Sequence, residues 1–359
     1  MALFDFTTLF TPNAIAINWK ENPSNREQYY LQNLFTPWKK QGLDLSWFKG
    51  SRGIGVSLMP TAFDAQITFR DREGFALTET EMPFFREGYK IKEKDRQELL
   101  KIRDLNDAYL NQFVDYIYDD LNNLIEGARI VKEREAAQLL FPANGNAGIS
   151  FKANGVDYTY NYDPNGTWKS ANYAALSGTR LWTAPATSDP IADLETMKEA
   201  VYNNTGSEPT LVIMNGNTLN YMLQSQSIIN RFKTFNNVTT PYLTKEELSA
   251  IVEKATGMTI FVYNKKYRDE SKTAHGFVPD GYVSLIPTDA PLGRLAMGTT
   301  PEEADLLSGR STASVAIVDT GIAITQKVED QPVNVNTWAS LIALPTFERM
   351  DEVACIKVY

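Results

Sequence analysis

One stretch of the chain has a helical pattern much longer than any other. Between Asp95 and Ala137 the sequence contains no proline, and Gly127 is its only glycine. Apolar residues recur there every three or four positions, a spacing that places them on one stripe of an α-helix. We therefore predict a helix over 95–137, about 65 Å long at 1.5 Å per residue. Gly127 is the point where this helix is expected to kink or end.

Alternating apolar and polar residues predict strands on both sides of this helix. Residues 149–162 alternate around Asn154-Gly155, the dipeptide most typical of a tight hairpin, so we predict a hairpin over that range. Residues 65–70 and 89–92 alternate in the same way and are joined by a charged segment. That pattern predicts a long β-hairpin over 49–92, which projects from the body towards a partner surface.

The first 48 residues follow neither period. They combine short apolar runs with prolines and aromatic residues, so we interpret 1–48 as an extended arm that packs its aromatic side chains on another surface. A partly ordered N-terminal subdomain is the alternative. The aromatic residues concerned are Phe4, Phe6, Phe10, Phe35, Trp38 and Trp47.

Helix signals alternate with short apolar runs in the second half of the chain. Ser188-Asp189-Pro190 predicts a helix start, and Thr244 with Glu247 forms a capping box before a helix that Gly257 ends. This mixture of helices and strands predicts an α+β fold. The strands are predicted at 211–214, 259–263, 282–286, 314–318, 321–325 and, apolar on both faces, 352–359.

Composition excludes several classes of protein. The 359 residues carry a net charge of −9, and the longest basic cluster is Lys265-Lys266 with Arg268, which argues against sequence-wide binding to nucleic acid. With one cysteine and one histidine, intrachain disulfides and Cys/His zinc sites are excluded. No apolar run approaches the ~20 residues that span a bilayer, and no signal peptide is evident. We expect a reducing cytoplasm as the place of synthesis and no membrane partner.

The sequence predicts no catalytic site, cofactor or metal site. It contains no Walker A, dinucleotide-binding or nucleophile-elbow motif. The acidic clusters are interpreted as solvated faces, with a divalent cation at a subunit contact as the alternative. His275 is expected in a loop and Cys355 in a buried strand. The clusters are Asp119-Asp120, Glu302-Glu303 with Asp305, and Asp351-Glu352.

Three motifs in the same order resemble the lambda-like major capsid protein E family of tailed phages. Together they extend over roughly residues 182–359, and the order of the earlier elements in residues 1–140 is similar by layout. None of these motifs is catalytic. They are Trp182 with Asp189-Pro190-Ile191-Ala192-Asp193-Leu194 and Thr205-Gly206 to Met214; Phe277-Val278-Pro279-Asp280-Gly281-Tyr282 with Gly298-Thr299-Thr300-Pro301; and Ser340 to Thr346 with Asp351-Glu352-Val353-Ala354.

The resemblance implies the Hong Kong 97-like capsid fold and a set of domains. In that fold residues 93–185 would form the peripheral domain, with 95–137 as its spine helix. Residues 186–345 would form the axial domain. The implied ranges also include the N-terminal arm 1–48, the extended loop 49–92, the hairpin 149–162, and the C-terminal strand 346–359 returning to the peripheral domain.

The family further implies partners and a location. The chain would assemble with itself into pentamers and hexamers of an icosahedral shell in the virion, built in the host bacterial cytoplasm. That shell would enclose double-stranded DNA without sequence-specific binding. A separate scaffolding protein is implied because the arm starts close to Met1, and a portal protein and a decoration protein are further expected partners.

Charged residues of the predicted extended loop are the candidate subunit contacts. We expect them to form ion pairs with a neighbouring copy. An encapsulin-like compartment shell is the alternative with the same fold, and a carboxylate-dependent enzyme using Asp64, Asp193 and Asp280 is the alternative from another class. The candidate contact residues are Arg70, Arg72, Glu73, Glu79, Glu81, Arg86 and Glu87.

Overall fold

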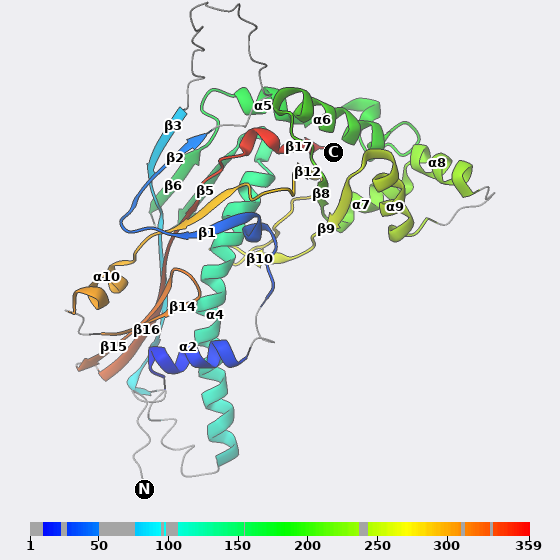
Figure 1. Cartoon of the computed structure of the whole chain (residues 1–359). Coiled ribbons are helices and arrows are strands. Elements are labelled where there is room, and N and C mark those ends of the chain that lie inside the picture. Colours follow the sequence, from blue (N-terminus) through cyan, green and yellow to red (C-terminus); the bar gives the residue numbers. More distant parts are fainter. Residues whose placement is uncertain are drawn as a thin grey trace, which may run out of the picture. The chain divides into compact units, whose positions relative to one another are not determined.

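The chain forms two compact units from interleaved segments. A computed structural model (Figure 1) describes residues 10–22, 27–49, 76–94, 97, 107–153, 155–236, 243–309, 313–330 and 333–359. Unit 1 comprises Met1–Leu45, Glu79–Arg134 and Arg294–Thr346, and unit 2 comprises Ser46–Thr78, Glu135–Gly293 and Phe347–Tyr359. Each unit is therefore built from chain segments that are far apart in sequence.

A six-stranded sheet forms the centre of unit 1 within the described residues. Its longest strand, β16 (Val333–Pro345), pairs antiparallel with β15 (Ile322–Asp330) along one edge. Along the other edge β16 pairs with β4 (Phe84–Ile91) and then with β13 (Gly293–Met297). The order is completed by β14 (Ser314–Val318) beside β15 and β1 (Phe35–Lys39) beside β13.

Two helices cover one face of this sheet. Helix α2 (Pro12–Glu21) begins at Thr11, whose side chain accepts from the backbone of Ala14, and has proline at its first position. Helix α4 (Asp107–Leu140) buries its apolar stripe against the same face. The shared core consists of Phe10, Ile15, Ala16 and Trp19, of Ile117, Leu121, Leu124, Ile125 and Ala128, and of the strand residues Met297, Ala316, Val318, Ile322, Ile324, Ala339, Leu341 and Ala343.

The predicted long helix is confirmed, but the bounds of the described helix differ from the predicted bounds. Helix α4 passes through Gly127 without a break and ends at Leu140. No atom outside the helix lies within 4 Å of where a Cβ on Gly127 would stand, so this glycine does not serve a close contact. Helix packing against the sheet outweighs the roughly 1 kcal/mol that a mid-helix glycine costs. The expected start at Asp95 lies outside the described residues.

The N-terminal segment differs from the predicted arm. Phe10 and Phe35 are 1 % exposed, and both are buried in the chain's own unit 1. Trp47 is also buried, in unit 2, where its ring lies 5.5 Å from that of Tyr162. The described part of 1–48 thus buries aromatic side chains within its own chain, because Thr11-Pro12 starts a helix that carries Ile15 and Trp19 on one face. Phe4 and Phe6 lie outside the described residues.

A mixed five-stranded sheet forms the centre of unit 2 in the described chain. β17 (Ala354–Lys357) and β8 (Leu211–Met214) each pair antiparallel with the central β12 (Tyr282–Ile286). β7 (Tyr173–Ala175) runs parallel to β17, and β9 (Thr259–Val262) runs parallel to β8. All four residues of β8 are buried, as expected for a strand covered on both faces.

Four helices cover one face of this second sheet. Their apolar residues pack on Val212, Met214, Val283, Leu285 and Ile356. The predicted capping box is present in α9, where Thr244 accepts from the Glu247 backbone and Gly257 ends the helix with a φ of 71°. The helices are α6 (Pro190–Thr205), α7 (Gly216–Gln224), α8 (Gln226–Asn236) and α9 (Lys245–Thr256).

Shorter elements complete the described chain. The predicted hairpin is confirmed as β5 (Gly148–Ala153) and β6 (Val156–Asn161), with Ala153 opposite Val156 and Gly155 at a φ of 78°. Such a turn favours glycine because a side chain at positive φ is strained. Two further strand pairs are β2 (Asp44–Lys49) with β3 (Ala76–Glu81), and β10 (Lys266–Arg268) with β11 (Ala274–Gly276). The short helices are α5 (Thr167–Asn172) and α10 (Pro301–Ser308). The 3-10 turns are Leu31–Leu34, Ala143–Gly145, Gly178–Arg180 and Met350–Glu352.

Strand pairing differs from the predicted domains in three places. Residues 89–92 were expected to pair within a projecting hairpin, yet most of them belong to β4, which pairs with β16. Residues 314–345 were expected with the rest of 186–345, yet β14, β15 and β16 belong to unit 1. The final strand pairs with β12 and β7 in unit 2, apart from the hairpin β5–β6. Periodicity identifies a strand but does not specify its distant partner.

Candidate contact surfaces

A buried carboxylate joins helix α10 to the sheet of unit 1. Thr300 caps the helix, and the Glu302 side chain after it is 8 % exposed. Glu302 accepts hydrogen bonds at 3.0 Å from both Trp338 Nε1 and Ser340 Oγ, and it forms an ion pair with Arg86 of β4. Burial by itself raises the pKa of Glu302, but these hydrogen bonds and the Arg86 charge outweigh it, so the pKa lies below its usual value.

The neighbouring carboxylate is held in the same way. Glu303 accepts from Lys39 Nζ at 2.5 Å, and the same ammonium donates to the carbonyl oxygen of Gly298 at 3.0 Å. The prediction that Glu302-Glu303 forms a solvated face is therefore wrong. Both side chains point at the sheet because cationic partners, Arg86 and Lys39, come from strands more than 200 residues away in the sequence.

The outer edge of β4 is lined with charges. Among the described strands, none pairs with the edge of β4 that faces away from β16. Residues 86–90 are exposed, and Lys90 reaches across to Glu329 of β15 at 3.1 Å. Charged side chains on an open edge discourage indiscriminate pairing with strands of other molecules. The edge is therefore suited to a specific partner rather than to general aggregation.

The predicted contact residues do not all lie in one place. Arg86 and Glu87 are exposed on β4, and Arg86 already pairs with Glu302 within the chain. Glu81 is exposed at the end of β3, which also contains Glu79. The remaining members of the predicted set, Arg70, Arg72 and Glu73, lie outside the described residues.

A third buried carboxylate fixes the N-terminal segment to α4. The Glu133 side chain is 0 % exposed and accepts from three consecutive backbone N–H groups. The distances are 3.2 Å to Tyr30, 2.9 Å to Leu31 and 2.8 Å to Gln32, where a 3-10 turn begins. Local sequence pattern did not reveal this site, because a glutamate in a helix is expected to be solvated.

Of the three aspartates that the enzyme alternative would use, the two that are described have separate hydrogen-bond partners. Asp193 is buried and accepts from Arg180 at 2.6 Å and from Trp182 Nε1 at 3.0 Å. Asp280 accepts from the amides of Asn215 and Asn217. Asp64 lies outside the described residues. Among those that are described, no group of three or more His, Cys, Asp or Glu side chains is placed to hold a metal ion.

The single histidine and the single cysteine lie in different surroundings. His275 is exposed on β11, and its Nε2 lies 2.9 Å from a carboxylate oxygen of Asp269. Hydrogen bonds from Ser271, the Thr273 backbone and His275 lower the pKa of Asp269 to about 2. Cys355 is fully buried in β17, as expected, and burial raises the pKa of its thiol. No helix of the described chain combines the length and apolar character that crossing a bilayer requires.

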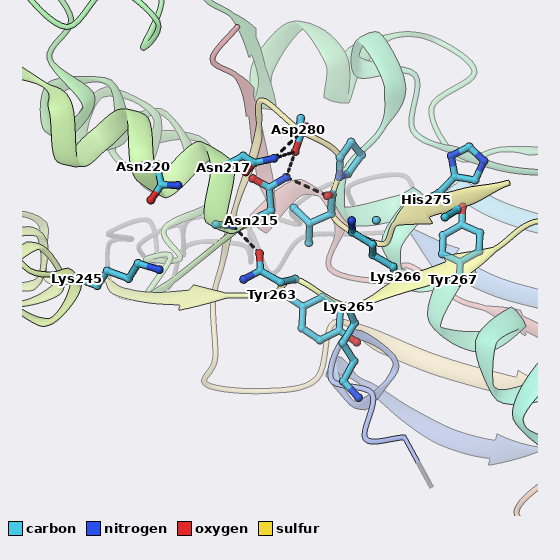
Figure 2. A pocket seen from close by; sticks show the side chains of 16 residues that line it. Asn215, Asn217, Asn220, Lys245, Tyr263, Lys265, Lys266, Tyr267, His275 and Asp280 are labelled. Atoms are coloured by element: carbon cyan, nitrogen blue, oxygen red, sulfur yellow. Dashed lines mark hydrogen bonds between the residues drawn. The ribbon is translucent and has the colours of Figure 1, made fainter. Parts of the chain in front are cut away.

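Unit 2 contains a polar pocket at the carboxyl ends of the parallel strands β8 and β9 (Figure 2). Its volume is about 810 Å³. Asp280 is the only carboxylate among its lining residues, whereas Lys245, Lys265 and Lys266 all line it. An acid-lined catalytic cleft would have the opposite balance of charge, so this pocket does not support the enzyme alternative.

A family model and several solved structures resemble this chain. The family described as phage major capsid protein E matches residues 15–358. The putative capsid protein of a prophage of E. coli CFT073 superposes with a TM-score of 0.58 at 14% identity, covering 98% of this chain and 99% of that one. A phage-related protein from Bordetella bronchiseptica RB50 gives a TM-score of 0.55 at 14% identity, covering 97% of each chain.

A third structure extends the same comparison. The capsid protein of cyanophage A-1(L) gives a TM-score of 0.51 at 10% identity, covering 94% of this chain and 97% of that one. A search of curated proteins finds no sequence match. At such low identities the structures establish the Hong Kong 97-like fold, and the family match extends over nearly the whole chain. The chain therefore belongs to the phage major capsid protein E family and has the Hong Kong 97-like capsid fold.

Proposed function

We propose that this chain forms the pentamers and hexamers of an icosahedral phage head that encloses double-stranded DNA. The family match over residues 15–358 is the observation that supports this proposal most strongly. Many modest contacts per subunit stabilise such a shell through multivalency. The role is structural, and it is consistent with the separate engagement of Asp193 and Asp280 described above.

The two units correspond, in this proposal, to the two domains of the fold. Unit 1, with α4 as its spine helix, is the peripheral domain, and unit 2 is the axial domain. The N-terminal segment then belongs to the peripheral domain, because α2 is part of the unit 1 core. The extended loop is the segment between β2 and β3.

Subunit contacts are proposed for the charged residues of that loop and of the strands that follow it. Arg70, Arg72 and Glu73 lie between β2 and β3 in the sequence, and Glu87 is exposed on the open edge of β4. Arg86 has a partner within its own chain, so a neighbour would have to compete with Glu302 for it. Glu79 and Glu81 complete the proposed set.

The partners and the location follow from the same proposal. A separate scaffolding protein, a portal protein and a decoration protein are proposed to join the shell, which is assembled in the host cytoplasm and becomes part of the virion. The net charge of −9 fits a container for DNA, since an acidic inner face repels packed phosphates. An encapsulin-like compartment shares the fold, but the family match favours the phage head.

The role of the loop is tested by a replacement that respects the observed strands. Deleting residues 72–86 would remove β3 together with Phe84 to Arg86 of β4, and would unfold part of unit 1. Replacing residues 52–73 with a short Gly-Ser linker leaves β2 and β3 intact. We expect a folded chain that no longer forms closed shells in negative-stain electron microscopy.

A second variant tests the charges of the loop without changing its length. In it, Arg70, Arg72 and Glu73 are replaced by glutamine and the chain length is unchanged. We expect fewer and less regular shells, because the proposed ion pairs are lost. Normal shells from the linker variant would contradict the proposed loop contacts. Failure of the wild-type chain to form any shell, with its scaffolding protein present, would contradict the proposed function itself.

A further inference from the structure

The polar pocket of unit 2 carries an excess of positive charge. Three lysines line it against one carboxylate, Asp280, which is already held by the amides of Asn215 and Asn217. Figure 2 shows Lys245 extending from α9 and Lys266 from β10 towards the pocket from opposite sides. A space bordered by ammonium and amide donors favours an anionic occupant.

The two lysines that face each other lack a carboxylate partner. In the described chain, neither Lys245 nor Lys266 forms an ion pair. Lys245 is also the first residue of α9, where the helix dipole opposes a positive charge. A carboxylate beside Lys245 would relieve that unfavourable placement, and a second carboxylate could pair with Lys266.

The location of the pocket adds further donors. It lies where β8 and β9 end and where α7 begins, so Asn215, Gly216 and Asn217 at the start of α7 line it, although Thr218 N–H is already capped by Asn215. Asn264 holds the Gly216 N–H at 2.6 Å. A volume of about 810 Å³ accommodates several side chains from one rigid element. A single small anion would leave most of the space to water.

Helix α6 of the same unit carries a surface of the complementary kind. Glu195, Glu199 and Tyr202 follow one another at spacings of four and three residues, which places them on one face of the helix. Glu199 is exposed, and Tyr202 is 50 % exposed. Neither glutamate forms an ion pair with any other described residue. We call Glu195, Glu199 and Tyr202 the acidic face of α6.

We propose that the pocket of one subunit receives the acidic face of α6 from a neighbouring copy. Glu195 and Glu199 would pair with Lys245 and Lys266, and Tyr202 would contact the aromatic lining of the pocket. Both surfaces belong to unit 2, so every copy carries one pocket and one acidic face. A contact between two different surfaces repeats from copy to copy, and it closes into a ring when the rotation between neighbours divides a full turn.

The inference rests on the proposed shell function and deepens it, because it assigns a contact within the rings of that shell. Rim charges in contacts of this kind govern partner choice and the salt dependence of association. Ring formation is therefore expected to weaken as ionic strength rises.

Charge reversal and charge exchange test the proposal. In full-length protein, Lys245→Glu with Lys266→Glu should reduce the assembled fraction by more than about tenfold, as should Glu195→Lys with Glu199→Lys. Combining the two pairs of changes in one chain should restore most of the assembly. Lys254→Glu makes one such charge reversal in the last turn of α9, outside the pocket, and should have little effect. Circular dichroism checks that each variant is folded.

A disulfide provides a second measurement that does not depend on charge. The only native cysteine, Cys355, is buried, so Glu199→Cys with Lys266→Cys introduces the only accessible thiols. Oxidation of assembled particles should give a ladder of covalent oligomers on a non-reducing gel. Only monomer on that gel, from particles that assembled normally, would overturn the proposal.

The remaining outcomes are equally decisive. Wild-type assembly together with normal assembly of the Lys245→Glu, Lys266→Glu variant would overturn the α6 contact and leave the shell function standing. Stoichiometric binding of tripolyphosphate to the wild-type pocket, without rescue by charge exchange, would make the pocket a small-anion site and would also overturn it. Failure of the wild-type chain to assemble would instead count against the proposed function.

Discussion

Removing the Glu133 carboxylate should detach the N-terminal segment from helix α4. In the Glu133→Ala variant the backbone N–H groups of Tyr30, Leu31 and Gln32 lose their acceptor. The bond to Leu31 is fully buried and the other two are partly buried. A buried donor left without a partner costs roughly 1–3 kcal/mol, and a partly hydrated one costs less. The sum is about 3–5 kcal/mol, a large share of the roughly 5–15 kcal/mol that stabilises a folded protein.

Two measurements on the unassembled chain check this magnitude. Hydrogen exchange followed by mass spectrometry should show faster exchange in the peptide that contains residues 30–34, by more than about tenfold. Urea denaturation should show a midpoint lower by roughly 1 M, given a slope of about 3 kcal/mol per M. Unchanged exchange at Leu31 and Gln32 would refute the assignment of Glu133 as their acceptor.

Two comparison variants separate the causes. Glu133→Gln keeps one acceptor oxygen, so its cost should be about half that of the alanine variant. Glu253→Ala removes an exposed helix glutamate from α9 and should change stability by less than about 0.5 kcal/mol. Equal losses in all three variants would mean that charge or helix propensity, rather than the three hydrogen bonds, accounts for the effect.

Two further predictions concern the unit 1 sheet. The pKa of Glu302 is lowered in the folded state. Its contribution to stability is therefore present above the usual carboxyl pKa and is lost as pH falls through the lower folded pKa. Urea midpoints measured from pH 7 down to pH 3 should fall less steeply for Glu302→Gln than for wild type. Gly88→Ala would put a Cβ 2.6 Å from Trp338 Cβ and should lower the melting temperature. Gly127→Ala, with no atom within 4 Å of the new Cβ, should raise the melting temperature by the equivalent of about 0.5–1 kcal/mol. A melting temperature unaffected by Gly88→Ala would contradict the close packing of β4 on β16.

Local signals in the sequence predicted local structure well. The period of three to four residues identified α4, and Asn154-Gly155 identified the hairpin between β5 and β6. The capping box at Thr244 and the stop at Gly257 both appear in α9. Each of these features depends on residues within a few positions of one another, where backbone geometry and side-chain capping determine the outcome.

Features that depend on distant partners were not predicted. Glu302 is acidic and follows a helix start, so its sequence context favours solvent, and only the structure places Arg86 and Trp338 beside it. The pocket in unit 2 combines Lys266, part of the basic cluster noted in the sequence, with Lys245 of helix α9. The sequence did contain a signal for the start of α2, because Thr11-Pro12 precedes an apolar pattern of helical spacing.

The interleaving of the two units has a consequence for synthesis on the ribosome. Strand β4 finds its partner in β16, and β12 finds one of its partners in β17, at the very end of the described chain. Neither sheet can close until nearly all residues have emerged from the exit tunnel. Contacts of such high sequence separation fold slowly and leave strand edges open in the meantime. A chain that is cut short before β16 therefore lacks a complete sheet in either unit.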